Sequence, residues 1–239
     1  MRILHSVSIA AGGSAWDRRE RAKESELMEQ AMRTILVANP KGGCGKTTLS
    51  TNLAAYLAGQ NQRVVMWDLD RQKSSLDWLA LRPAELPTIT SLDADRNEIH
   101  PDIPENYDWL VLDSPAGMHG KNLAHALKLA DKVVVPVQPS VFDMAATRNF
   151  LDQLMEEKSV RKHKAFIGII GMRVDSRTRA AATLEQFLEQ YDLPILTYLR
   201  DTMVYVNAAF NGKGIFDLPP YQAERDLLQW QPIIEWVNA

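Results

Sequence analysis

A glycine-rich loop close to the start of the chain constrains the fold more than any other feature. It follows an apolar, β-branched segment and leads into a long helical pattern. Its residues are Lys41-Gly42-Gly43-Cys44-Gly45-Lys46-Thr47-Thr48. Glycines between a strand and a helix let backbone N–H groups approach an anion, and the helix N-terminus adds partial positive charge. By average residue frequencies, the pattern arises by chance in roughly a few per 100,000 chains of this length. The loop therefore predicts a phosphate-binding site.

The side chains of this loop indicate which phosphate compound it binds. The three glycines leave the backbone open to phosphate oxygens. Lys46 supplies positive charge to the β- and γ-phosphates of a nucleotide, and the Thr47 hydroxyl is a ligand for Mg²⁺. We therefore expect ATP and Mg²⁺ as cofactors, with all eight residues of the loop in the nucleotide site.

Short β-branched runs alternate with helical patterns after this point. The expected strands are residues 35–38, 64–67, 109–112, 133–135, 165–170 and 195–199. These runs are almost continuously hydrophobic, which is typical of parallel strands covered on both sides. The alternation predicts an α/β fold, a doubly wound, mostly parallel sheet with helices on both faces. Ligands of such P-loop folds bind at the carboxyl ends of the strands.

The first residues differ in composition from the rest of the chain. A Gly-Gly-Ser break at residues 12–14 leads into a stretch of mixed charge with few apolar positions. We expect residues 1–32 to be a partly ordered extension or a solvated helix, and residues 33–239 to form one domain. The apolar part of the N-terminus is interrupted by His5, Ser6 and Ser8, which argues against a secretory signal peptide.

Charge and cysteine content exclude several function classes. The formal net charge of −3 means that any DNA affinity must come from a local patch. Cys44 is the sole cysteine, which excludes an internal disulfide or a multi-thiolate metal site and fits a reducing cytoplasm. No apolar run approaches the roughly 20 residues needed to span a bilayer. We therefore expect a cytoplasmic protein that does not bind membranes.

Three sequence boxes at matching intervals resemble one ATPase family. Pro40 stands where the generic phosphate loop has glycine, and Lys41 follows it. Residues 64–72 read Val-Val-Met-Trp-Asp-Leu-Asp-Arg-Gln, and residues 107–117 read Tyr-Asp-Trp-Leu-Val-Leu-Asp-Ser-Pro-Ala-Gly. These resemble the deviant Walker A box, the Asp-x-Asp-Pro-Gln box and the Walker B strand of the ParA/MinD family. The resemblance covers about residues 33–239.

The resemblance implies roles for individual side chains. Lys41 would reach the ATP of a partner subunit in a homodimer that sandwiches the nucleotide, as an arginine finger does. Asp70 would orient the attacking water, whereas Asp68 and Asp113 would hold Mg²⁺ through its waters. Arg173 falls near the position that contacts adenine in relatives. Lys41 and Asp70 are therefore the expected catalytic residues.

The sequence departs from the family pattern at two positions and favours its compact ParA branch. Arg71 replaces a proline, which frees the backbone or adds a cation near the phosphates, and Cys44 replaces a small apolar residue. Residues 227–239 contain no Lys or Arg, unlike the membrane-docking helix of MinD-like proteins, so that segment is expected to pack on the core. With 32 residues before the domain, a DNA-reading winged helix is not expected.

Two arginines resemble the family's contacts with DNA of any sequence. Arg177 lies in residues 174–179, and Arg200 lies in residues 199–202. The basic residues between positions 158 and 179 are Lys158, Arg161, Lys162, Lys164, Arg173, Arg177 and Arg179. A run of like charge is often only a solvated face; the family match favours nonspecific double-stranded DNA as a partner.

These features favour a nucleoid-associated positioning ATPase. ATP would close a dimer that grips DNA, and a ParB-like or cargo adaptor protein would stimulate hydrolysis and release. The cargo would be a plasmid, a chromosome region or a large protein body such as the carboxysome. The alternative is a metabolic P-loop enzyme that phosphorylates or activates a small molecule. ATP-dependent binding to nonspecific DNA separates the two functions.

Overall fold

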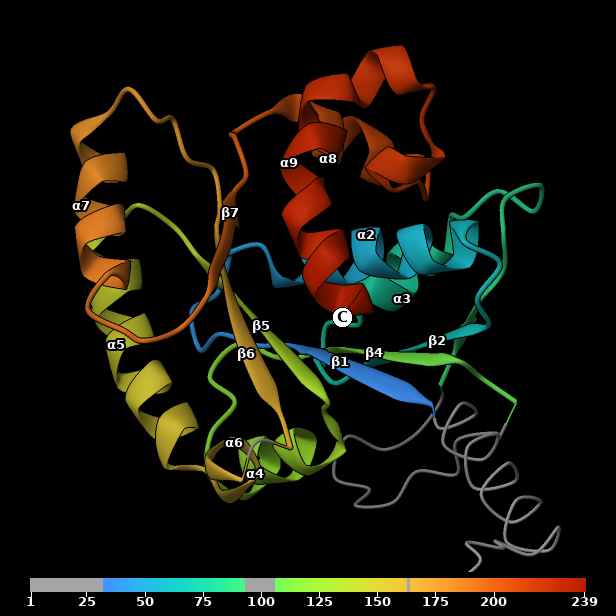
Figure 1. Cartoon of the computed structure of the whole chain (residues 1–239). Helices are drawn as coiled ribbons and strands as arrows, with labels where there is room; N and C mark the ends of the chain where they lie inside the picture. The colour runs from blue at the N-terminus through green and yellow to red at the C-terminus, as the bar shows by residue number, and fades with distance from the viewer. Residues whose placement is uncertain (1–31, 93–105, 163) are drawn as a thin grey trace, which may run out of the picture. The chain divides into compact units, whose positions relative to one another are not determined.

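A seven-stranded sheet lies at the centre of the computed structural model, which describes residues 32–92, 106–162 and 164–239. Every pair of neighbouring strands is parallel, in the order β3-β2-β4-β1-β5-β6-β7 (Figure 1). The strands are β1 (Arg33–Val37), β2 (Val64–Asp68), β3 (Ile89–Ser91), β4 (Trp109–Asp113), β5 (Lys132–Val137), β6 (Phe166–Gly171) and β7 (Ile195–Tyr198). The predicted doubly wound α/β fold is confirmed.

Helices cover both faces of the sheet. One face carries α2 (Lys46–Gly59), α3 (Ser74–Ala80), α8 (Met203–Ala209), the 3₁₀ helix η1 (Ile215–Asp217) and α9 (Pro220–Asn238). The other face carries α4 (Gly120–Leu129), α5 (Val141–Glu156), α6 (Lys158–Arg161) and α7 (Arg179–Leu188). Figure 1 shows the two groups on opposite sides of the strands.

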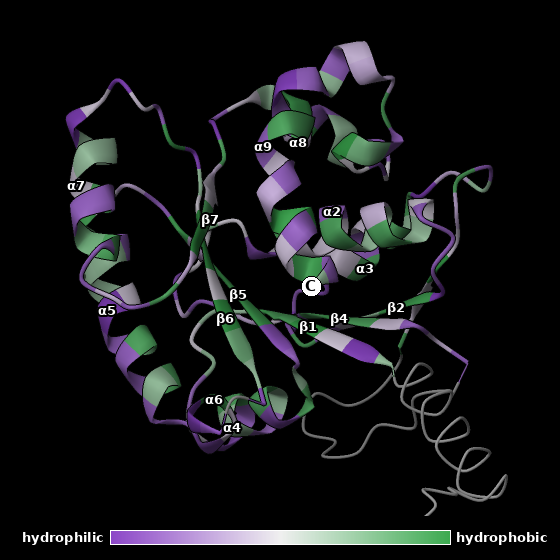
Figure 2. Cartoon of the chain, in the orientation of Figure 1, coloured by the Kyte–Doolittle hydropathy of each residue, from purple (hydrophilic) through white to green (hydrophobic). Residues whose placement is uncertain are grey.

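Two hydrophobic cores follow from the alternation of side chains along each strand. In β1, Ile35 and Val37 join the core beneath α2, whereas Leu36 joins the core beneath α4 and α5. The strands are hydrophobic along most of their length in Figure 2, whereas hydrophobic and hydrophilic residues alternate along the helices. This pattern is expected when a parallel sheet is buried on both sides. Trp230 and Ile233 of α9 are fully buried, as predicted for that segment.

The six expected strands are present with bounds shifted by up to two residues. The seventh, β3, was not expected: it is three residues long and pairs with β2 at the edge of the sheet. The predicted N-terminal extension, apart from Met32, lies outside the described residues. Because all the strands are parallel, their carboxyl ends lie on the same side of the sheet, and the candidate site lies at these ends.

Candidate functional site

The phosphate loop is fixed between β1 and α2 by side chains from its surroundings. Asn39 Oδ1 accepts a hydrogen bond from Lys41 N at 2.8 Å, while Asn39 Nδ2 donates to Pro136 O at 2.8 Å. Gln138 Nε2, beyond the end of β5, donates to Gly43 O at 2.8 Å. Gly45 has φ +102°, and a Cβ there would lie 2.6 Å from the side chain of Met172. Any other residue at position 45 would therefore be strained by the positive φ, and the end of the Met172 side chain would have to move.

Lys46 is turned back into the loop rather than out toward solvent. Its Nζ donates to Lys41 O at 2.8 Å and lies 3.8 Å from Cys44 Sγ, and its side chain is buried. Burial raises the pKa of the Cys44 thiol above its ordinary value. The thiol itself donates to Lys41 O at 3.2 Å. Cys44 is therefore a packed, neutral thiol, and the Lys46 ammonium group is held within the phosphate loop by the carbonyl of Lys41.

A buried carboxylate lies directly beside the start of α2. Asp113, the last residue of β4, accepts a hydrogen bond from Ser50 Oγ at 3.1 Å. Burial raises the pKa of Asp113 to about 7; hydrogen bonds from Thr47 and Ser50 and the charge of Lys46 oppose that rise, and the charge of Asp68 adds to it. Mg²⁺ is usually held by one or two carboxylates together with phosphate oxygens. Thr47 and Asp113 fit that ion.

The hydroxyl next to Asp113 supports the same interpretation. Ser114 is 2% exposed, and among the described residues its Oγ has no hydrogen-bond partner. A buried unsatisfied hydroxyl in a folded protein needs an explanation, and a ligand or an ordered water is the usual one. Sequence reasoning did not single out Ser114, because a lone serine after a strand carries no pattern of its own.

Asp68 is the register partner of Asp113 across β2 and β4, but its carboxylate is already satisfied within the chain. Its Oδ1 accepts from Asp70 N at 2.9 Å, and its Oδ2 accepts from Ser75 N at 2.9 Å and Ser75 Oγ at 2.7 Å. Asp68 is fully buried. Its predicted contact with Mg²⁺ through water stays a prediction; in this structure Asp68 anchors the start of α3.

The loop between β2 and α3 presents Asp70 at the carboxyl edge. Asp70 is half-buried, and its Oδ1 accepts from Gln72 N at 3.1 Å. Its other carboxylate oxygen has no hydrogen-bond partner among the described residues. Lys73 has φ +53° and donates from Nζ to Asp68 O at 2.7 Å. Sequence reasoning did not single out Lys73, because its contact with the Asp68 carbonyl forms only in the folded loop. Arg71 is exposed in this loop.

A cavity of about 510 Å³ opens beside the phosphate loop. Its walls come from the start of α2, from α3, from the segment after β6 and from α8. Arg173 lines the cavity with φ +53°, and its Nε lies 4.0 Å from Asp201 Oδ1. Thr47 and Thr48 of the phosphate loop line the same cavity as Arg173. The adenine contact expected of Arg173 stays a prediction.

The two predicted DNA-contacting arginines have different surroundings. Arg177 forms a bidentate pair with Asp175, at 2.9 and 2.8 Å, and its side chain is 87% exposed. Arg200 forms a bidentate pair with Asp226 of α9, at 2.8 and 2.9 Å, and Asp226 is fully buried. Arg177 can exchange its partner for a phosphate at small cost, because exposed pairs contribute little. A DNA contact by Arg200 would require its buried pair to open.

The basic run that contains Arg177 is divided by β6. Lys158, Arg161, Lys162 and Lys164 precede this strand, whereas Arg173, Arg177 and Arg179 follow it. A strand of six residues spans about 20 Å. The two groups therefore lie at opposite ends of the parallel strands. Only the second group lies at the carboxyl ends, where the phosphate loop also lies.

This constellation has a counterpart among known proteins. A family model described as CobQ/CobB/MinD/ParA nucleotide binding domain matches residues 35–215, which is well over half of the chain. The chain belongs to this family. Its domain is a nucleotide-binding ATPase domain of the ParA/MinD type, as the sequence boxes indicated.

Relatives within the family include positioning and partition ATPases. Maintenance of carboxysome distribution protein A of Halothiobacillus neapolitanus is 30% identical over 190 residues, covering 77% of this chain and 87% of that protein. The chromosome-partitioning ATPase Soj of Thermus thermophilus is 30% identical over 198 residues, covering 69% and 79%. Apo McdA from Cyanothece has a TM-score of 0.69 at 16% identity, covering 87% and 100%, which shows the shared fold.

No helix among the described residues has the length and hydrophobicity that crossing a membrane demands.

Proposed function

We propose that this protein is an ATP-dependent positioning ATPase that distributes a large cargo, such as a plasmid, a chromosome region or a carboxysome, over nucleoid DNA. The observation that carries the proposal is the placement of two features on one edge of the sheet. The phosphate loop follows β1 and the exposed Arg177 follows β6, and both strands end at that edge. A dimer closed over ATP would join two such arginine loops. Likeness to carboxysome-distribution and chromosome-partitioning ATPases supports the proposal.

Each residue of the proposed site has a separate role in hydrolysis. Lys46 leaves the carbonyl of Lys41 and binds the β- and γ-phosphates, while the backbone of the glycine loop donates to their oxygens. Thr47 and Asp113, with Asp68 behind them, would hold Mg²⁺, which supplies positive charge to the phosphates when bound. Asp70 orients a water that attacks the γ-phosphorus; the bond to the β–γ bridging oxygen breaks, and ADP leaves.

Lys41 completes the site from the other subunit. Its side chain is half-buried, and no hydrogen bond or ion pair of its ammonium group is found among the described residues. In the proposed homodimer it approaches the partner's ATP and stabilises the charge that develops in the transition state. A ParB-like or cargo adaptor protein then stimulates hydrolysis, which opens the dimer and releases it from DNA.

Cosedimentation with double-stranded DNA of arbitrary sequence tests the proposal. The protein with ATP and Mg²⁺ should sediment with DNA at low salt, and the protein with ADP should remain in the supernatant. Absence of binding in both nucleotide states would overturn the positioning function. The metabolic enzyme would then be the better description, since such an enzyme has no reason to bind DNA.

A further inference from the structure

The loop of residues 212–217, between α8 and α9, rests on the helix that begins at the phosphate loop. Asn52 of α2 accepts a hydrogen bond at Oδ1 from Ile215 N at 2.7 Å. The same amide donates from Nδ2 to Thr48 O at 2.7 Å, within the first turn of α2. This loop is therefore tied to the helix turn that carries the Mg²⁺ ligand Thr47.

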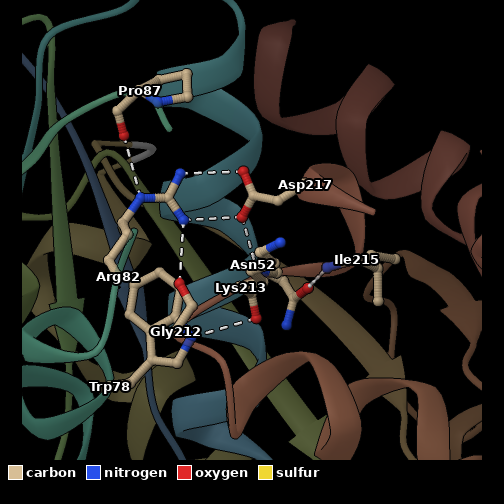
Figure 3. A network of polar contacts seen from close by, with 9 residues as sticks. Asn52, Trp78, Arg82, Pro87, Gly212, Lys213, Ile215 and Asp217 are labelled. Carbon is tan, nitrogen blue, oxygen red and sulfur yellow. Dashed lines mark hydrogen bonds and ion pairs between the residues drawn. The ribbon is translucent and has the colours of Figure 1, made fainter. Parts of the chain in front are cut away.

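The other side of the loop is clamped to the end of α3 by a buried ion pair. Arg82 donates from its two terminal nitrogens to Asp217 Oδ2 at 2.8 Å and Oδ1 at 3.0 Å (Figure 3). Both side chains are 4% exposed. The guanidinium also donates to Pro87 O at 3.1 Å and to Gly212 O at 3.4 Å. Bidentate pairs of this kind fix orientation as well as distance.

Two further contacts leave the clamp little freedom. Trp78 of α3, which lines the cavity beside the phosphate loop, donates from Nε1 to Lys213 O at 3.3 Å (Figure 3). Gly212 has φ +61°, and a Cβ there would lie 2.3 Å from the backbone of Leu81. The backbones of this loop and of the end of α3 are thus in direct contact.

The opposite end of α3 holds the predicted catalytic loop. Ser75 binds Asp68 through both its N–H and its hydroxyl, and Asp68 in turn accepts from the N–H of Asp70. The helix is seven residues long, which is about 10 Å. A short rigid helix transmits a displacement at its far end to its near end. Any tilt of α3 allowed by a broken clamp would therefore move Asp70.

We propose that Arg82 and Asp217 are positioning residues for ATP hydrolysis. The clamp holds α3 at a fixed distance from α2, and so holds Asp70 against the γ-phosphate site on the phosphate loop. It acts on the hydrolysis step and leaves nucleotide affinity nearly unchanged, because neither side chain touches the nucleotide site. The inference rests on the proposed hydrolysis and on the proposed role of Asp70.

The second bidentate pair of the same segment provides the contrast. Arg200 and Asp226 hold the start of the segment that leads into α8, and Arg200 itself lines the cavity beside the phosphate loop. Disrupting the Arg200–Asp226 pair should therefore weaken ATP binding. Disrupting the Arg82–Asp217 pair should lower kcat and leave the affinity unchanged.

A paired substitution tests the clamp without leaving a buried charge. Removing one partner alone strands the other charge in the interior, whereas replacing both is often tolerated. In the wild type, Asp217 Oδ2 accepts a hydrogen bond from Gly214 N at 2.8 Å. In the double variant Arg82→Met with Asp217→Asn, the asparagine can still accept this bond. Single-turnover hydrolysis should slow by about tenfold or more. The affinity for a non-hydrolysable ATP analogue should stay within about twofold.

The matched control is the exposed bidentate pair of Arg63 and Asp108, which lies at the amino ends of β2 and β4, away from the phosphate loop. Arg63→Met with Asp108→Asn should leave both the rate and the affinity unchanged. If the Arg82 double variant does not fold, Arg82→Lys keeps the charge, loses the two-pronged bond, and should slow hydrolysis at unchanged affinity.

Unchanged single-turnover hydrolysis in a folded Arg82 variant would overturn the inference, as would a loss confined to nucleotide affinity. Failure of the proposed function looks different. In that case the wild type would not hydrolyse ATP, or Asp70→Ala would hydrolyse it at the full rate. Hydrolysis that needs Asp70 but ignores the clamp would remove this inference alone.

Discussion

Lys46 Nζ donates a hydrogen bond to the carbonyl oxygen of Lys41 at 2.8 Å, so the two lysines of the phosphate loop are linked. The link holds the buried ammonium group in place within the loop, where the proposed function requires it to bind phosphate oxygens. The side chain of Lys41 is not needed for it, because the acceptor is a backbone atom. The two lysines can therefore be tested separately.

Lys46→Ala should abolish nucleotide binding, since it removes the main side-chain cation facing the phosphates. Because the lysine is buried and donates to a backbone carbonyl, the fold should be checked by circular dichroism. Calorimetric titration with ATP and Mg²⁺ measures the affinity. Binding close to that of the wild type would remove this loop from the nucleotide site.

Lys41→Ala should bind ATP almost normally but dimerise weakly and hydrolyse slowly. The carbonyl that accepts from Lys46 survives the substitution. The lost ammonium group is the one proposed to serve the partner's ATP, where a cation in trans contributes about 10³ or more in rate. Sedimentation velocity with and without ATP measures dimerisation. A normal ATP dimer with full turnover would reject the trans role.

The parts of the site that are contiguous in sequence were predictable, and the parts that meet only through folding were not. The loop from Lys41 to Thr48 carries its chemistry in one short pattern, and Asp68 and Asp113 end strands whose hydrophobicity is plain. The Arg82–Asp217 pair spans 135 residues, and the Arg200–Asp226 pair spans 26. No local period indicates such pairs.

Two further differences have physical causes. The strand β3 has a single buried residue, Ile89, so its three positions carry neither a hydrophobic run nor an alternation. The basic residues form one run along the sequence. In the structure, the length of strand β6 separates the first half of that run from the second. Charge runs indicate a surface only when the elements between them are placed.

Asp113 should make the stability of the nucleotide-free protein depend on pH. Its pKa rises from 3.8 to about 7 on folding because the carboxyl is buried. Between these values the folded state binds more protons than the unfolded state, so the free energy of unfolding falls as pH rises, by about 4 kcal/mol at most. Above about pH 7 this contribution is flat.

Asp113→Asn should remove that slope. Urea unfolding at several pH values, without nucleotide or Mg²⁺, should find the variant more stable than the wild type at pH 8. The difference should shrink toward pH 4. Equal pH profiles for the two proteins would show that the carboxyl is not buried as described.

Arg200→Glu should destabilise the fold before it affects DNA binding. The substitution places a carboxylate against the buried Asp226 and removes its bidentate partner. Breaking a buried pair costs about 3–5 kcal/mol, and the lower end applies because Arg200 is 37% exposed. Thermal unfolding measures the loss. A variant as stable as the wild type that no longer binds DNA would restore Arg200 as a direct contact.

Arg177→Glu should remove ATP-dependent DNA binding while stability, ATP affinity and dimerisation stay normal. Arg177 is 87% exposed, its partner Asp175 is a near neighbour on the same loop, and neither supports the core. A net charge of −3 gives no diffuse attraction to DNA, so binding depends on a local group of cations. Pairing two such groups in the ATP dimer roughly doubles the phosphates neutralised. Counterion release then predicts a log–log salt slope of about −0.9 per phosphate contacted, with little preference for sequence.

The salt slope of DNA binding distinguishes a direct contact from an indirect effect. Arg177→Glu should make the slope shallower, because fewer phosphates are neutralised in the complex. Lys162→Glu is the matched control: this exposed cation lies at the opposite edge of the sheet and should leave the slope unchanged. If Lys162→Glu makes the slope shallower and Arg177→Glu does not, DNA binds at the amino ends of the strands, beside α6. The ATP-dependent DNA contact proposed for Arg177 would then be wrong. In the proposed dimer, the subunits meet at the carboxyl ends of the strands and not at the amino ends.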